Sequence, residues 1–393
     1  MKILLLAPQP FYRERGTPIA VDLLLRALAD RSHQVDVLTY HLGRDVVYPG
    51  VRLHRIPHVP GVRDVPPGFS LRKLLCDLWM LPAALRLAAR GGYQLVHAVE
   101  ESVFMAMLIK RIHGIPYIFD MDSCMPAQMA EKHPRLKLLA HLMDRCETAA
   151  IRGALAVAAV CDALADRARA CRPAGVFLLR DISLLQRQAI SDTAESKEHL
   201  RQELDFKGFT FLYIGNLEHY QGIDLLLGGF AQLLKDVRQP ATLAIAGGTP
   251  EHIAHYKKQA ATLGITRQTR FLGPQPVDRM GLLFQAADAL VSPRIKGNNT
   301  PMKIYSYLDS GRPVLATNLP THTQVMSPET ACLVAPDPEA MAAGMQQLLA
   351  DHDYGQRLAN SAGVVAAERH SWPVFQSAVN DLYQWLDRQL QQH

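Results

Sequence analysis

The chain has 393 residues, 48% of them hydrophobic and 20% charged, and a formal net charge of +5. This length is typical of two globular domains, and this composition supplies an ordinary hydrophobic core. The small positive charge, without basic runs interleaved with aromatic residues, argues against nucleic-acid binding, whereas it fits an anionic nucleotide or an anionic membrane surface.

The cysteines give no sign of a metal site or a disulfide. All six are scattered, and none forms a Cys-x-x-Cys pair: Cys76, Cys124, Cys146, Cys161, Cys171 and Cys332. We therefore expect reduced thiols and no bound metal. The apolar run 3–7 is too short for a signal peptide or a spanning helix, and no other window reaches about 18 apolar residues. The sequence predicts a cytoplasmic protein, at most attached to the inner face of the membrane.

In chain order, residues 3–7 are the first predicted strand. A polar loop follows it, and Gly16, Thr17 and Pro18 open a helix that extends to Leu28. The free amides and the positive dipole end of a helix N-terminus favour an anion such as a phosphate. Gly16 and Thr17 are therefore candidates for binding an anionic ligand.

Residues 35–40 and 51–56 are further predicted strands, and 70–90 is a predicted helix. This helix combines leucines and Trp79 with arginines and a lysine, and Pro82 is expected to kink or split it. Basic residues beside Leu and Trp are typical of interfacial helices. A helix packed on a core with one solvated face is the alternative interpretation.

Two later strands of the first half end in polar residues. His97 lies in the predicted strand 94–98 with Glu100 just after it, and the strand 117–120 is followed by Asp122. Because the carboxyl ends of parallel strands meet at one edge of a sheet, these three side chains are candidates for contact with a ligand. Structural hydrogen bonding at a strand end is the alternative for each.

A polar stretch at 181–207 lacks strand character and is the predicted connection between two domains. We expect an N-terminal domain over 1–185, a second domain over 186–375, and a final helix over 376–393 that packs back towards the first domain. The second domain starts with a strand at 209–214, and another strand at 242–246 ends in Gly247 and Gly248. Glycine there allows the backbone to approach a ligand closely.

The stretch 289–317 reads as strand, polar loop, helix and strand. Thr300 is the expected N-cap of the helix, with Pro301 in its first turn. The loop would lie at the carboxyl end of a strand, where α/β sheets bind ligands, and Arg294, Lys296 and Lys303 add positive charge. An ordinary connecting loop with solvated charges is the alternative.

Taken together, these motifs resemble the glycosyltransferases of family 4. The resemblance extends over nearly the whole chain and depends on 211–227, 246–248, 271–273, 287–293 and the pattern Pro-x-Lys-Ile-Tyr-x-Tyr-Leu-x-Ser-Gly-x-Pro-Val at 301–314. It implies an α/β protein with two facing Rossmann-like domains and parallel sheets, the GT-B fold. It also implies a nucleotide-sugar donor held mainly by the second domain, retention of the anomeric configuration, and no metal or other cofactor.

The resemblance assigns roles to particular residues. Lys303 and Arg294 would stabilise the leaving diphosphate, and Asp122 stands where many members have a catalytic-site histidine. His97 and Glu100 would lie on the acceptor side. The residues expected to bind the donor are Gly16, Thr17, Gly215, Asn216, Gln221, Gly247, Lys296, Asn298, Asn299, Thr300, Pro301 and Ser306.

Four of these positions depart from the usual pattern of the family. Members usually carry glutamates at the positions of Asn298 and Ser306, an arginine at that of Asn216 and a lysine at that of Gln221. Ser306 could offer the ribose a single hydroxyl contact. Neutral groups can still hydrogen-bond a phosphate, at roughly half the strength of charged ones.

The predicted function is a retaining, metal-independent sugar transfer from a nucleotide-sugar to a cell-envelope glycan or a lipid-linked acceptor. The basic segments 70–90 and 132–141 suggest peripheral contact with the membrane that carries the acceptor. A nucleotide-sugar 2-epimerase is one alternative and would use Glu100, Asp120 or Asp122 for proton abstraction. A non-catalytic sugar-nucleotide-binding subunit is the other, suggested by the four departures.

Overall fold

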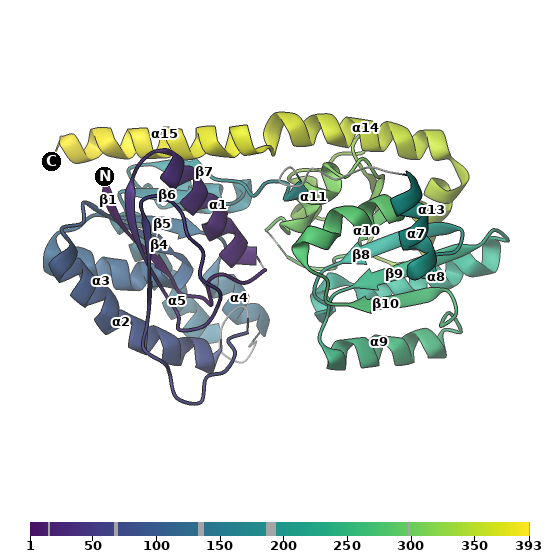
Figure 1. Ribbon diagram of the computed structural model, residues 1–393, viewed down its shortest axis with the longest axis horizontal. Coiled ribbons are helices and arrows are strands. Elements are labelled where there is room, and N and C mark those ends of the chain that lie inside the picture. The colour runs from purple at the N-terminus through teal and green to yellow at the C-terminus, as the bar shows by residue number, and fades with distance from the viewer. Residues whose placement is uncertain (15, 67–69, 133–136, 186–193, 298, 393) are drawn as a thin grey trace. The chain divides into compact units, whose positions relative to one another are not determined.

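The computed structural model describes residues 1–14, 16–66, 70–132, 137–185, 194–297 and 299–392 (Figure 1). The chain divides into two compact units, Met1–Arg180 with Phe375–His393, and Asp181–Val374. Among the described residues, no helix combines the length and the apolar character needed to cross a membrane.

The first unit is built on a parallel sheet of seven strands in the order β3-β2-β1-β4-β5-β6-β7. The strands are β1 (Lys2–Ala7), β2 (Gln34–Thr39), β3 (Val51–Arg55), β4 (Leu95–Val99), β5 (Tyr117–Met121), β6 (Ala156–Ala159) and β7 (Val176–Leu178). Its helices are α1 (Gly16–Asp30), α2 (Leu71–Gly91), α3 (Val103–His113), α4 (Met125–Lys132), α5 (Lys137–Gly153) and α6 (Asp162–Ala170), with a short 3₁₀ turn η1 (Glu100–Ser102).

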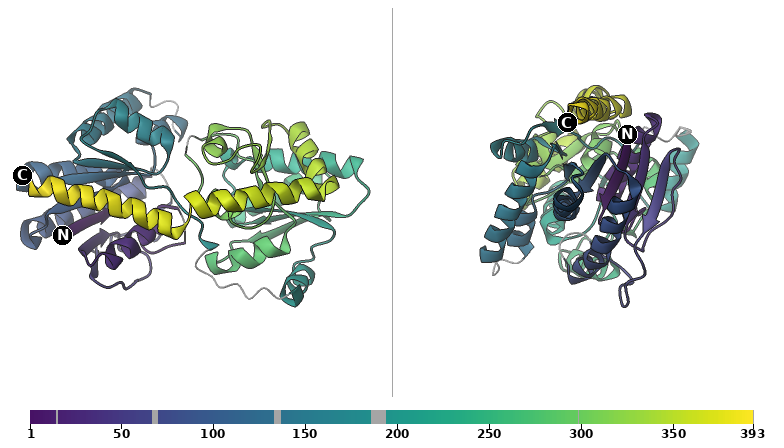
Figure 2. Two further views of the ribbon diagram at one scale, coloured as in Figure 1. Left: turned by 90° about the horizontal axis from the view of Figure 1, so that it is seen from above. Right: turned by 90° about the vertical axis from the view of Figure 1, so that its left-hand side faces the viewer.

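The strand order reverses between β1 and β4, so right-handed crossovers place α1 and α2 on opposite faces of the sheet. The α2 face holds one continuous core that includes Leu4, Val96, Phe119 and Met80. The opposite face of β4 meets α15 (Trp372–Gln391), whose Tyr383 contacts His97. Figure 2 shows α15, in yellow, lying along the first unit. The C-terminal helix thus returns to the first unit, as the fold prediction required.

The second unit has a parallel sheet of six strands in the order β10-β9-β8-β11-β12-β13. The strands are β8 (Phe209–Ile214), β9 (Ala241–Ala246), β10 (Thr269–Gly273), β11 (Ala289–Ser292), β12 (Val314–Thr317) and β13 (Cys332–Val334). Its helices are α7 (Ala194–Glu203), α8 (Ile223–Asp236), α9 (Pro250–Thr262), α10 (Met280–Ala286), α11 (Lys303–Leu308), α12 (Pro320–Thr323), α13 (Pro338–Ala350) and α14 (His352–Arg369), with 3₁₀ turns η4 (His219–Gln221) and η5 (Val277–Arg279).

Both sheets confirm the predicted α/β class with parallel strands. The strands are short apolar runs buried on both faces, as parallel sheets require. The strand order of the second sheet reverses between β8 and β11. Ligands of open α/β sheets bind at such a reversal, outside the carboxyl ends of the strands.

The structure corrects two helix predictions. α2 is not split at Pro82 and forms one helix from its Ser70 cap to the left-handed Gly92. Pro82 has no N–H to donate to the carbonyl of Leu78, one turn earlier. Because both residues lie on the exposed side of α2, that carbonyl can bind water instead. α11 begins at Lys303 rather than at Pro301, and Thr300 does not cap it.

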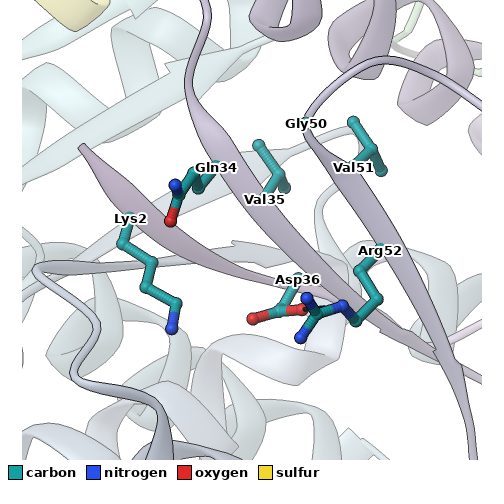
Figure 3. Close-up of a pocket in the computed structure, with 7 residues that line it drawn as sticks. All are labelled: Lys2, Gln34, Val35, Asp36, Gly50, Val51 and Arg52. Carbon is teal, nitrogen blue, oxygen red and sulfur yellow. Dashed lines mark ion pairs between the residues drawn. The ribbon is translucent and has the colours of Figure 1, made fainter.

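A cavity of about 300 Å³ opens at the amino ends of β1, β2 and β3 (Figure 3). Asp36 lies within it and accepts hydrogen bonds from His54 Nε2 and Tyr93 Oη, both at 2.8 Å, while Arg52 Nε lies 3.9 Å away. This end of the sheet is opposite to the carboxyl ends of the strands. We therefore do not assign the cavity to the active site.

Candidate active site

In the second unit, the site lies at the reversal between β8 and β11. The loop after β8 starts at Gly215 and leads through η4 into α8. The loop after β11 starts at Pro293 and leads into α11. Because β8 and β11 are hydrogen-bonded neighbours, both loops begin at the same edge of the sheet.

Two glycines let the backbone segments of this edge come together. Gly215 has a φ of +151° and Gly247 a φ of +109°. A Cβ atom on Gly247 would lie 2.0 Å from the carbonyl oxygen of Gly215. The Gly247 amide donates to the Gly273 carbonyl at 2.7 Å, which fixes this close approach. Only glycine fits at position 247 without moving the strand ends.

Lys303, the first residue of α11, points its ammonium group towards the loop after β8. Its Nζ lies 3.8 Å from the ring centroid of Tyr213 and 3.5 Å from Gln221 Oε1. Burial, and then the nearby Arg294, hold the pKa of Lys303 well below its usual value. In the described part of the chain, no carboxylate forms an ion pair with it. An anion beside this amino group would raise its pKa again and favour its charged form.

Arg294 is a second buried cation at the same edge, 8% exposed. Its Nη1 donates to the carbonyl of Asn299 at 3.0 Å and to Thr321 Oγ1 at 2.9 Å. Its guanidinium carbon lies 5.0 Å from the ring centroid of Tyr220. These contacts tie Arg294 to Asn299, Thr321 and Tyr220 and keep the guanidinium at the reversal point.

A histidine that the sequence analysis did not single out stabilises this edge of the second sheet. His322 is fully buried, and its Nδ1–H donates to the Thr317 carbonyl at 2.8 Å. Its Nε2 then accepts from Ser292 Oγ, also at 2.8 Å. Burial lowers the pKa of His322 to about 4, aided by the charges of Lys303 and Arg294. The neutral ring thus ties the ends of β11 and β12 together.

The carboxyl edge of the first sheet carries a cluster of acidic groups. Glu100 follows β4 with a φ of +52°, and Ser123 Oγ donates to its two carboxylate oxygens at 2.9 and 3.1 Å. Lys73 of α2 forms an ion pair of 2.6 Å with the adjacent Glu101. Burial, opposed by Lys73 and reinforced by Glu101, raises the pKa of Glu100 to about 7. A non-glycine residue with positive φ and a perturbed carboxyl are both common at functional sites.

Two family profiles match the chain and together cover most of it. The profile of the glycosyl transferases group 1 matches residues 196–363, and that of the glycosyl transferase 4-like domain matches residues 15–175. The chain is a glycosyltransferase of the family 4 type. Each profile falls mainly on one of the two structural units.

Relatives of this glycosyltransferase agree with that assignment. D-inositol 3-phosphate glycosyltransferase from Corynebacterium diphtheriae is 29% identical over 200 residues, which span 49% of this chain and 45% of the relative. Sucrose-phosphate synthase from Thermosynechococcus elongatus has a similar structure, with a TM-score of 0.83, 19% identity and coverage of 99% of both chains. The HepE protein of Anabaena in complex with UDP-glucose has a TM-score of 0.75 at 16% identity, over 98% of this chain and 99% of that chain. These structural similarities confirm the GT-B fold.

Among the predicted donor residues of the glycosyltransferase, several lie at the reversal in the second unit. Gln221 lies beside Lys303, and Gly215 and Gly247 approach each other closely at the same edge of the sheet, as described above. Asn216 is exposed, and its Oδ1 accepts from the Glu218 amide at 3.2 Å. The other residues differ in exposure: Lys296 is exposed, Asn299 and Pro301 are half-buried, and Thr300 is buried. Asn298 lies outside the described residues.

Ser306 is not placed as the sequence analysis expected. Its side chain is fully buried, and its Oγ accepts a hydrogen bond from the Leu184 amide at 3.1 Å. The hydroxyl group therefore anchors the segment that leads into the second unit. A contact between Ser306 and a ribose has no support from this geometry.

In the first unit, Gly16 is exposed at the start of α1, and Thr17 is half-buried beside it. Asp122 is half-buried in the loop after β5. His97, in contrast, is fully buried on the face of the sheet: Nδ1 lies 2.7 Å from Tyr383 Oη and Nε2 lies 3.1 Å from Asp120 Oδ2. One ring nitrogen thus contacts α15 and the other contacts the neighbouring strand β5, which favours the structural alternative for this residue.

The raised pKa of Glu100 predicts a pH-dependent stability of the glycosyltransferase. The folded state keeps the proton up to about pH 7, whereas the unfolded chain releases it near the ordinary value of 4.5. Stability should therefore fall as the pH rises from about 4.5 to about 7. The Glu100→Gln variant should unfold at a higher temperature than the wild type at pH 8, and this advantage should shrink at pH 5. Thermal unfolding at both pH values tests this.

The matched control for this measurement is Glu368→Gln, at an exposed glutamate near the end of α14. That variant should keep the pH profile of the wild type. Parallel profiles for Glu100→Gln and the wild type would contradict the burial-driven shift.

Proposed function

We propose that this glycosyltransferase moves a sugar, with retention of its anomeric configuration, from a nucleotide-sugar to a cell-envelope glycan or a lipid-linked acceptor. The observation that carries the proposal is the pair of basic side chains at the β8–β11 reversal, half-buried Lys303 and buried Arg294. Among the described residues, the neutral Gln221 and the ring of Tyr213 are the near partners of Lys303, and Arg294 is held close by. A diphosphate group has the charge and the hydrogen-bond acceptors that suit these two side chains.

In the proposed reaction, the bond between the sugar and the diphosphate breaks as the acceptor oxygen forms a bond to the same carbon. Negative charge develops on the departing diphosphate, and Lys303 and Arg294 stabilise it without a metal ion. The acceptor hydroxyl gives its proton to that diphosphate on the face from which it attacks. This route needs no pair of carboxylates, unlike the hydrolysis of a glycoside.

Other predicted residues keep their proposed roles. Gly215, Gly247, Gln221 and Asn216 line the donor side of the second unit. In the first unit, the amides of Gly16 and Thr17 are proposed to contribute to anion binding, because they begin α1, a helix of 15 residues. Glu100 and Asp122 are proposed to contact the acceptor.

The surface of α2 supports an acceptor at a membrane. One side of α2 packs on the core through Cys76, Met80, Ala84 and Ala88. The other side exposes apolar side chains, with exposed fractions of 71% for Leu71, 45% for Leu74, 57% for Leu78 and 40% for Trp79. Arginines lie on the same helix. Such a surface suits peripheral binding to the cytoplasmic face of a membrane with anionic lipids.

A product analysis tests the proposal and separates it from its alternatives. The purified protein is incubated without metal with UDP-glucose and GDP-mannose, and with D-inositol 3-phosphate or an alkyl glucoside as acceptor. A free nucleoside diphosphate in equal amount to a glycosylated acceptor, with the anomeric configuration retained, is the expected result. An altered sugar still bound to its nucleotide would indicate an epimerase. Binding of a nucleotide-sugar without any product would indicate a non-catalytic subunit.

A further inference from the structure

The first unit contains a second cavity, of about 330 Å³, among α2, α3, α4 and α5. Its walls are apolar and are formed by Leu74, Leu78, Leu81, Phe104, Met105, Leu108, Met125, Met129 and Met143. Its polar end is formed by Ser70, Lys73, Asp77, Glu100 and Glu101. Figure 1 shows α2 and α3 side by side over the same part of the sheet.

The walls of this cavity have the character of a ligand pocket rather than of a packing defect. The cavity is open at its rim, and apolar surface that gathers in such an open hollow often marks a ligand-binding groove. Four of its wall residues are methionines, whose unbranched side chains adapt to irregular ligands. Leu74 and Leu78 are about half exposed and lie at its rim. Apolar walls with a few polar groups at one end are typical of small-molecule sites.

The polar end defines which head group the cavity accepts. Its charged side chains are already engaged with protein groups: Lys73 with Glu101 at 2.6 Å, Asp77 with Tyr40 Oη at 2.6 Å, and Glu100 with Ser123. Glu101 balances the charge of Lys73, and Asp77 and Glu100, whose pKa values burial raises to about 7, repel an anionic head group once they ionise above that pH. Carboxylate oxygens accept hydrogen bonds, so hydroxyl groups are the partners that suit them. Glu100 also follows the end of β4, where the acceptor is proposed to react.

We propose that this cavity binds the hydrocarbon chain of an uncharged acceptor amphiphile whose hydroxyl-bearing head group lies at Glu100. This inference rests on the proposed function, since it names the chemical class of the acceptor. Of the two acceptor classes in the proposed function, an apolar cavity favours the lipid-linked acceptor over a purely hydrophilic glycan. The chain lies between α2, α3 and α4, and the head group lies at the carboxyl edge of the sheet.

Binding of a series of alkyl β-glucosides, from hexyl to dodecyl, tests the proposal. Calorimetry is performed below the micelle concentration and without vesicles. Affinity should rise about fourfold for each added methylene, which is the effect of burying one such group. The rise should stop once the chain fills the cavity. Dodecanoate, which has an anionic head group, should bind at least about tenfold more weakly than dodecyl glucoside because of the carboxyl groups.

Two variants on the same helix distinguish the cavity from the general surface of α2. Leu78→Asp places a charge at the rim, and because Leu78 is exposed the fold should tolerate it. We expect at least a tenfold loss of affinity for dodecyl glucoside. Leu71→Asp is the matched control, because Leu71 is 71% exposed and does not line the cavity. Equal losses in both variants, a rise in affinity without a plateau, or no binding would overturn the proposal.

Affinity for UDP, measured on the same samples, separates this inference from the proposed function. The account expects both variants to bind UDP as the wild type does. Transfer of sugar to hexyl and dodecyl glucosides with equal efficiency would overturn the cavity proposal and leave the transferase standing. Chain-length-dependent binding of glucosides by a protein that transfers no sugar would contradict the transferase instead.

Discussion

Replacement of Lys303 by alanine is expected to weaken the binding of a nucleoside diphosphate by more than about tenfold, the scale of one charge-assisted contact. The ammonium group is held in a dry position against Tyr213 and Gln221, where its interaction with an anion is weakly screened. Calorimetric titration with a nucleoside diphosphate measures this loss of affinity. Lys296→Ala is the control: this lysine is exposed on the same loop, so its removal should change the affinity less.

The pH dependence of binding gives Lys303 a second readout. Its pKa is held well below the usual value by burial and by Arg294, and a bound diphosphate raises it again. Binding should therefore take up a proton, and affinity should fall as the pH rises. Titrations in two buffers with different heats of ionisation detect this uptake, which Lys303→Ala should abolish. An unchanged affinity of the variant, with no proton uptake by the wild type, would place the diphosphate elsewhere.

Replacement of Gly247 by alanine is expected to cost about 3 kcal/mol of unfolding free energy or more, and to abolish nucleotide binding. The φ of +109° is strained for any residue with a Cβ, and that atom would lie 2.0 Å from the Gly215 carbonyl oxygen. The overlap can be relieved only by separation of the ends of β8 and β9. Denaturant titration and calorimetry with UDP measure the two effects.

Gly264→Ala is the matched control for this substitution. Gly264 also has a positive φ, of +74°, but an added Cβ would meet nothing within 4 Å. Its replacement should cost only the backbone strain, about 1 kcal/mol, and leave UDP binding intact. Equal losses of unfolding free energy and of UDP affinity in the two variants would contradict a role for the close approach between Gly247 and Gly215.

Much of the fold could be predicted from the sequence because the signals were local. Short apolar runs such as 3–7 and 289–292 predicted buried parallel strands, and they form β1 and β11. The polar loop after 289–292 predicted the edge of the second sheet where Lys303 and Arg294 lie. The alternation of strands and helices predicted the α/β class, and the joint occurrence of the motifs predicted the family.

The side-chain environments could not be predicted, because they depend on contacts between distant segments. Ser306 fits a ligand-facing position by its motif, yet it faces Leu184, which lies 122 residues earlier. His97 lies near the carboxyl end of β4, but its side chain points to the face of the sheet where it contacts Tyr383 of α15. His322 and Tyr220 carried no motif that marked them. The acidic cluster likewise combines Lys73 of α2 with Glu101 in the turn after β4, which lies 28 residues later.

The start of α11 was predicted wrongly for a related reason. Thr300 and Pro301 have the residue types of a helix start, but the Asn299 carbonyl is held by Arg294 and Thr321, and the chain becomes helical only at Lys303. Tertiary hydrogen bonds thus outweigh the local preference. The shift matters for function, because it makes Lys303 the first residue of α11.

The most direct test of the central claim, a nucleotide-sugar donor site at the β8–β11 reversal, is a thermal-shift screen of the purified protein against UDP, GDP, ADP, CMP and dTDP without metal. One nucleotide should stabilise the fold, by roughly 2.7 kcal/mol at a hundredfold excess over its dissociation constant. The same nucleotide should stabilise Lys303→Ala much less. Stabilisation by none of the five, or equal stabilisation of the wild type and the variant, would contradict the account.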